Sequence, residues 1–207
     1  MPLNPRYLKE LSETFVDDLR RSDYYRQLNA AQRQDLDDRI REETALGYYP
    51  LLPGAGATDL ARLSSAAYEE LHVRLPEAVI DILRQVDGFV MNGVNLYGVD
   101  GDLRDDKFDA VPGLLAENLV QWSSYPETLQ RYLFIGDADL WHFGIEIGTG
   151  RALALAKGTL AAAHEFSTLE ELVEDMLRQA LGYFEDKIEE SEHETEDDSA
   201  GYYFSRS

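Results

Sequence analysis

The sequence predicts an α+β fold in which a twisted, mostly antiparallel sheet, expected over residues 89–163, is flanked by helices. The first signal is the segment 75–98, which is patterned as helix, turn, strand, tight turn and strand. The second is the segment 141–157, where apolar residues alternate along the first strand and a Gly-Thr-Gly connection tolerates positive φ. The chain has 207 residues, 44% of them hydrophobic, so it can bury a core as one domain with extensions.

Two helices are expected before this core. Asn4-Pro5 is typical of an N-cap followed by proline at the first helical position. The second helix starts at Asn29, has Gln32 as its capping-box partner and stops at Gly47. With the glycine-containing linker that follows, residues 1–57 are predicted to be an N-terminal helical extension. It is expected to be a subfamily feature, an oligomer contact or a partner-binding arm. The first helix carries an apolar stripe spaced by three and four: Leu8, Leu11, Phe15 and Leu19.

The segment 58–98 holds the strongest local signals. Leu75-Pro76 opens a helix, because the missing N–H of proline costs nothing in a first turn. Asp87-Gly88 ends that helix, and Asn92-Gly93 is a strong turn dipeptide between two short strands. The second strand leads into Tyr97-Gly98. The apolar faces of this helix and the one before it repeat at helical spacing: Leu60, Leu63, Ala67 and Leu71, then Val79, Ile80, Leu83 and Val86.

Beyond residue 98 the pattern changes several times. Residues 100–109 are too charged for a core strand and are expected to form an acidic loop. A helix with Leu114, Leu115, Leu119 and Trp122 on its apolar face is expected to end near Ser123-Ser124. Further strands and a last core helix, opened by a capping box from Ser167 to Glu170, complete the core over residues 58–184. Between residues 185 and 198 nine carboxylates accompany one lysine, which predicts that residues 185–207 are an acidic, disordered tail.

These motifs occur in an order that resembles the SUKH superfamily. That group contains the yeast Smi/Knr cell-wall regulators and many bacterial toxin-immunity proteins. The resemblance covers roughly residues 58–181 and includes the central strands Tyr132–Asp137 and 141–157. It implies the same architecture of a helix-flanked sheet. The residues that carry the motifs are Leu75, Pro76, Asp87, Gly88, Asn92, Gly93, Tyr97, Gly98 and Gly136.

The charge of the chain restricts its partners. It has 19 basic and 40 acidic residues, a net charge of −21. Such a field repels phosphate backbones and anionic lipid surfaces, and it speeds encounter with basic proteins. We therefore expect neither nucleic acid nor a membrane as a partner. The alternative, that the acidity only maintains solubility, stays open.

No catalytic or metal-binding pattern stands out. The four histidines lack metal-ligand spacing, and the chain has no cysteine. Asp100 and Asp102 start an EF-hand-like pattern, but Arg104 occupies the third ligand position. His142 and Glu146 are separated by an even number in a predicted strand and are interpreted as a surface pair. The sequence therefore predicts no catalytic residue, no metal and no cofactor. An unrecognised enzyme is kept as a third hypothesis.

The resemblance implies an immunity protein that binds a cognate toxin domain with a basic surface and neutralises it stoichiometrically. Without a signal peptide or a membrane span, the chain is expected to be cytoplasmic, which favours a nuclease, deaminase or nucleotide-modifying toxin. The alternative is a non-catalytic regulatory or scaffolding module that binds through its N-terminal helices or its tail. Sequence leaves the toxin and the oligomeric state open. The expected partner-binding residues are Asp100, Asp102, Asp105, Asp106, Asp137, Asp139 and, as a half-exposed interface aromatic, Trp122.

Overall fold

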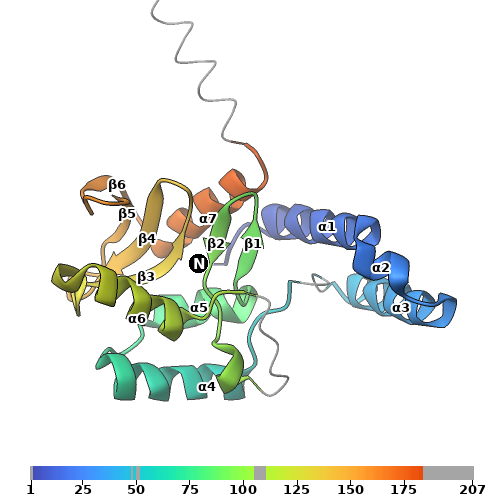
Figure 1. Cartoon of the computed structure of the whole chain (residues 1–207), viewed down its shortest axis with the longest axis horizontal. Coiled ribbons are helices and arrows are strands. Elements are labelled where there is room, and N and C mark those ends of the chain that lie inside the picture. The colour runs from blue at the N-terminus through green and yellow to red at the C-terminus, as the bar shows by residue number, and fades with distance from the viewer. Residues whose placement is uncertain (1, 48, 50–51, 105–110, 184–207) are drawn as a thin grey trace, which may run out of the picture.

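The predicted α+β class is confirmed by the computed structural model, which describes residues 2–47, 49, 52–104 and 111–183. Six antiparallel strands follow one another across an open sheet in the order β1-β2-β3-β4-β5-β6, so each strand pairs with its neighbour in sequence (Figure 1). This simple meander needs no crossover connection. The strands are β1 Phe89–Met91, β2 Val94–Leu96, β3 Tyr132–Asp137, β4 Trp141–Glu146, β5 Ala152–Ala156 and β6 Ala162–Phe166.

Helices cover both faces of this sheet. Figure 1 shows α6 in front of the strands and α7 behind them, with α4 and α5 below. Because of this double cover, every residue from 132 to 136 in β3 and from 142 to 145 in β4 is buried. The helices are α1 Pro5–Arg21, α2 Asp23–Gln27, α3 Ala30–Ala45, α4 Ala57–Ala66 with the π-helical turn η1 Ala67–Leu71, α5 Glu77–Gln85, α6 Leu114–Ser124 and α7 Leu169–Ala180. None of the described helices is long and apolar enough to cross a membrane.

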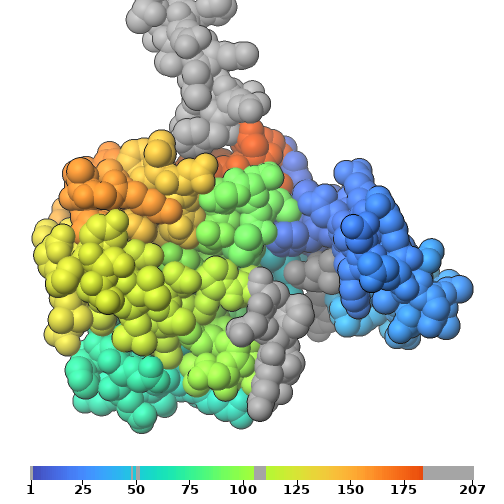
Figure 2. All heavy atoms as spheres, viewed as in Figure 1, coloured from blue at the N-terminus to red at the C-terminus, as the bar shows by residue number. Residues whose placement is uncertain are grey.

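The first three helices form an arm that stands away from the body (Figures 1 and 2). Its base belongs to the main core, because Leu3, Leu8 and Leu11 are buried in the same cluster as the sheet. Its far end is held by polar contacts: Asp37 of α3 accepts hydrogen bonds from Arg20 at 2.9 Å and Tyr25 at 2.6 Å. Residues 1–57 therefore contain both a buried anchor and a projecting hairpin of helices.

Local turn and capping chemistry behaves largely as predicted. Asn92 and Gly93 both have positive φ, 48° and 75°, as a tight hairpin turn between β1 and β2 requires. The capping box at Asn29 and Gln32 is present. The prediction for the last helix was one residue out: the Thr168 side chain, not Ser167, caps α7. Likewise Pro76 precedes α5 as its N-cap rather than opening it.

Two of the motif glycines are explained by a close chain crossing. Gly88 has a φ of +75°, which an L side chain rarely adopts. Gly98 lies across from Asp87, the residue before Gly88. A Cβ placed on Gly98 would come within 2.7 Å of the backbone oxygen of Asp87. The Asp87 carboxylate fixes the crossing by accepting a hydrogen bond from the Val99 N–H at 2.7 Å and by pairing with Arg104. This crossing places Tyr97 at the end of β2, under α6.

Candidate functional site

Helix α6 continues along β3 from the point where β2 ends. The last ladder contact of the β2 segment is the bond from the Tyr97 N–H to the Ile135 oxygen at 2.9 Å. The Asn118 side chain then satisfies the next backbone groups of β3. Its Nδ2 donates to the Phe134 oxygen at 2.7 Å, and its Oδ1 accepts from the Phe134 N–H at 2.8 Å. A buried amide thus replaces a strand partner, which fixes α6 relative to the sheet.

Trp122 makes a second tie between α6 and β3. Its Nε1 donates to the Tyr132 oxygen at 2.9 Å, and the residue is 6% exposed. The expectation of a half-exposed interface aromatic is therefore wrong for Trp122. An indole whose N–H finds a backbone acceptor is readily buried.

The start of α6 is capped from a distance by Asp100. The carboxylate accepts the N–H groups of Leu115 and Ala116, both at 2.9 Å, and the residue is buried. Burial raises the pKa of this carboxyl above its ordinary value. Sequence analysis placed Asp100 on an exposed acidic loop, which the structure corrects. The N–H groups at a buried helix start need acceptors, and for two of them the acceptor lies 15 and 16 residues upstream.

Three polar side chains near the first turns of α6 influence one another electrostatically, and we call them the Glu117 cluster: Tyr97, Glu117 and Asp137. Tyr97 is 1% exposed, and its hydroxyl has no hydrogen-bond partner among the described residues. The hydroxyl nevertheless lies near enough to the Asp137 carboxylate for a hydrogen-bonding interaction with it to contribute to the pKa of Tyr97. Burial and the charges of Asp137 and Glu117 raise the pKa of Tyr97, so the phenol stays protonated.

Glu117 is the residue of this cluster that sequence analysis missed. Its carboxylate is half-buried and makes no hydrogen bond or ion pair within the described part of the chain. Burial first, then the charges of Asp137 and Asp100, raise the pKa of Glu117. The only sequence signal was its position on α6, next to the apolar face but not part of it.

Asp137, at the end of β3, is held in place by two donors. Asn95 on β2 donates to Oδ1 at 2.9 Å, and the Lys157 ammonium after β5 reaches Oδ2 at 2.7 Å. The Asp137 side chain is 19% exposed and that of Lys157 is 32% exposed, so this pair lies at the border between core and solvent. Asp137 is thereby the anchored member of the cluster.

His142 lies next to Asp137 in the β3–β4 ladder and is buried. Its ring packs on Phe134 and Tyr125, with centroids 5.3 and 5.8 Å away, and neither ring nitrogen has a hydrogen-bond partner among the described residues. Burial and then the Lys157 charge lower the pKa of His142. The predicted surface pair with Glu146 is wrong, because β4 is covered on both faces.

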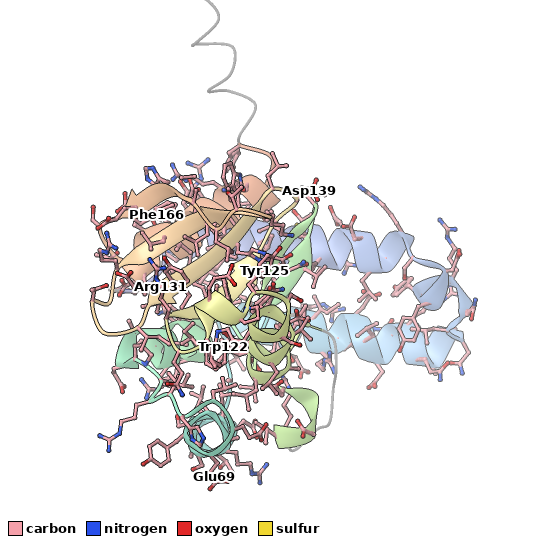
Figure 3. All side chains as sticks on the ribbon, turned by 60° about the vertical axis from the view of Figure 1, so that its left-hand side comes forward. Glu69, Trp122, Tyr125, Arg131, Asp139 and Phe166 are labelled. Carbon is pink, nitrogen blue, oxygen red and sulfur yellow. The ribbon has the colours of Figure 1, made fainter. Side chains whose placement is uncertain are left out.

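Two further predicted residues, Asp102 and Asp139, are exposed. Asp139 lies beside the β1–β2 turn, since a Cβ on Gly93 would be 3.4 Å from its Oδ1 (Figure 3). Asp102 acts electrostatically on Asp100, which in turn acts on Glu117. Asp105 and Asp106 lie outside the described residues. Electrostatic influences link Asp102 to Asp100, Asp100 to Glu117, and Glu117 to Asp137. Together with the exposed Asp139, we call these carboxylates the acidic band.

The acidic band is chemically a receptor for positive charge. Its acids are spread out: nowhere among the described residues are three His, Cys, Asp or Glu side chains grouped so that they could hold a metal ion. Within the band, Asp100 is buried and Asp137 is paired with Lys157. Such an arrangement attracts cations, and its exposed carboxylates accept hydrogen bonds.

In comparisons with known proteins, no family model matches the chain and no curated protein matches its sequence.

Proposed function

We propose that this protein is an immunity protein, which binds the basic surface of a cognate bacterial toxin domain and blocks it in a fixed stoichiometry without catalysis. The acidic band is the observation that carries the proposal. The resemblance of the motif residues to the SUKH superfamily, and an α+β fold of the kind that resemblance implies, support it. The net charge of −21 provides long-range attraction to a basic partner.

The toxin that fits such a band is one whose active site binds phosphate. A basic groove that holds a nucleic acid or a nucleotide is complementary to a series of carboxylates. Inhibition would then consist of occupying the subsites that phosphates use. We therefore propose a nuclease, deaminase or nucleotide-modifying toxin, acting in the cytoplasm where its substrates are.

A second candidate function rests on the arm. Along α3 only Ile40 is buried, although the helix has 16 residues. Between α1 and α3 lies a groove of about 230 Å³, lined by Lys9, Val16, Ile40 and their neighbours. A solvent-exposed helix beside an apolar groove offers a recognition surface. In this alternative the arm holds a cellular partner, and the protein is a regulatory or scaffolding module.

The two functions are separated by capturing partners of the full-length protein from its native cells. Size exclusion then measures the stoichiometry of any complex. An immunity protein is expected to recover one basic domain in a fixed ratio, with association that slows as salt rises. Recovery of a large cellular assembly that requires α3 would favour the scaffold instead.

A matched pair of charge reversals tests the acidic band directly. Asp139→Lys lies in the band, and Glu69→Lys makes the same change on exposed η1, which Figure 3 shows at the opposite end of the molecule. The proposal predicts that Asp139→Lys slows association with the toxin far more than Glu69→Lys. Equal effects would mean that only net charge matters, and the band would lose its role.

A further inference from the structure

Helix α6 is apolar on two sides. One side faces the sheet and is buried, and the bonds of Asn118 and Trp122 to β3 fix it there. The other side carries Leu119 and Val120, which are 46% and 55% exposed. The expectation that Leu119 belongs to the buried side is wrong, because the two bonds to β3 set the rotation of α6 and leave Leu119 facing away from the sheet. Glu117 is the one charged residue among the 11 of α6, and a helix so apolar all round is normally buried on every side.

Four exposed residues of α6 lie along one side of the helix, which we call the outer stripe. They occupy positions i, i+3, i+4 and i+7, the spacing that places side chains on one face of a helix. Figure 1 shows α6 in front of the sheet, and Figure 2 shows that this part of the molecule forms the front surface, with no described segment over it. The outer stripe consists of Ala116, Leu119, Val120 and Ser123.

The shape of the outer stripe fits another helix. Ala116 with Val120, and Leu119 with Ser123, form two parallel i,i+4 ridges with a groove between them. A second helix packs on such a surface by placing one of its own ridges in the groove. Small residues stand at both ends of the stripe and large ones in the middle, so a crossing helix buries Leu119 and Val120 at the centre of the contact. Helices that bind to a partner's surface use apolar anchors at this same spacing.

The charge around the outer stripe favours a basic helix. α6 has no basic residue, and Glu117 precedes Val120 by three positions, so the two are neighbours on the helix surface. The whole chain carries a net charge of −21. A second copy would bring the same charge to the interface and be repelled, whereas lysine or arginine beside the apolar residues of a partner helix would pair with Glu117. Charge complementarity therefore points to a basic partner rather than to self-association.

We propose that the outer stripe is the docking surface for a basic, amphipathic helix of the partner protein. The apolar side of that helix covers Leu119 and Val120, and its basic flank lies along Glu117. The assignment rests on the proposed function in one respect, that the helix belongs to the toxin domain. It adds an apolar contact to the attraction of the acidic band, because charge complementarity contributes more to association rate than to affinity.

Synthetic helical peptides test the surface without the toxin. The ¹⁵N-labelled full-length protein is titrated with an amphipathic leucine–lysine peptide while its amide spectrum is followed. Two control peptides separate shape from charge: a scrambled peptide of the same composition has no apolar side, and a leucine–glutamate peptide has the same apolar side with the opposite charge. The expected result is a saturable shift of the amides of residues 116–123 with the leucine–lysine peptide alone. Equal shifts with either control peptide, or no saturable shift at these residues, would overturn the proposal.

Two variants remove the apolar centre of the stripe. Leu119→Ser and Val120→Ser change exposed positions, and the amide spectrum reports whether each remains folded, so that either one alone decides if the other does not fold. Each should weaken binding of the leucine–lysine peptide by about tenfold, because the exposed half of an apolar side chain no longer gains from burial. Leu46→Ser is the matched control, since Leu46 is 73% exposed on the arm, and it should change binding little. Unchanged binding in the folded Leu119→Ser or Val120→Ser protein would refute the docking surface.

Self-association is tested by sedimentation of the full-length protein over a range of concentrations. The proposal expects a monomer. A dimer that Leu119→Ser dissociates would mean that a second copy covers the outer stripe, and the partner helix would be overturned.

The result is also independent of the immunity proposal. If a basic toxin domain is captured in a fixed ratio but the leucine–lysine peptide does not bind at α6, the docking surface fails and the inhibitor function stands. If the peptide binds at the outer stripe but no toxin is recovered, the docking surface stands and the inhibitor function fails.

Discussion

Replacing Asn118 by leucine should be among the most damaging single changes in this protein. Asn118 is fully buried, and its amide satisfies both the N–H and the oxygen of Phe134, at 2.8 and 2.7 Å. Leucine has a similar size but no polar atom, so both backbone groups are left buried and unpaired. Each unsatisfied group costs about 1–3 kcal/mol, of which the apolar side chain recovers a part. We therefore expect a loss of about 2–5 kcal/mol in the free energy of unfolding.

Urea unfolding of Asn118→Leu, followed by circular dichroism, measures this loss. Domains of this kind are stable by only about 5–15 kcal/mol, so the shift in midpoint should be large. Val120→Ala, at an exposed position of the same helix, is the control and should change stability by no more than about 0.5 kcal/mol. A loss below about 1 kcal/mol for Asn118→Leu would mean that α6 is not held by this amide, and the account of how the site is positioned would be wrong.

Three further predictions concern the crossing and the cluster. Gly98→Ala should lower the free energy of unfolding by about 1–3 kcal/mol, because the new Cβ would lie 2.7 Å from the Asp87 backbone oxygen. Gly56→Ala, where a Cβ would meet only an Asp59 oxygen at 3.4 Å, should change the stability little. A similar urea midpoint for both variants would contradict the close crossing. The pKa of His142 in the folded protein is lowered from 6.5, so the unfolded state binds the proton more readily. The wild-type protein should therefore lose stability as pH falls below about 6.5. His142→Phe should lack this pH-dependent loss in the same unfolding assay. The pKa of Glu117 is raised from 4.5, so the folded state holds this proton more tightly than the unfolded state. The wild-type protein should therefore lose stability relative to Glu117→Gln as pH rises through the raised pKa. A difference in stability between the two proteins that does not change with pH above 4.5 would contradict the raised pKa of Glu117.

Many elements could be predicted because their signals are local. Asn92-Gly93 requires only its own backbone preference to form the hairpin turn, and Asn29 with Gln32 caps α3 within one turn. The apolar spacing of Val79, Ile80 and Leu83 likewise predicts the buried face of α5, and all three are buried.

The candidate site was predicted only in part, for reasons of long-range geometry. Asp137 and Asp139 lie in the acidic band as partly or fully exposed acids, but Asp100 and Trp122 are buried against partners distant in the chain. Glu117 was missed altogether. Its raised pKa comes first from burial and then from the charges of Asp137 and Asp100, neither of which is near it in sequence.

The sequence by itself determined the α+β class, most of the helices and strands, several turns and the strong negative charge, because propensity, periodicity and composition act over a few residues. The short α2 and the last strand β6 were not predicted. The tertiary structure decided which side chains became buried and which charges met. A strand covered on both faces buries His142 as well as its apolar neighbours, and a helix that replaces a strand partner requires Asn118 in the core. The contact between Asn118 and Phe134, for example, joins residues 16 positions apart, so no local pattern contains it.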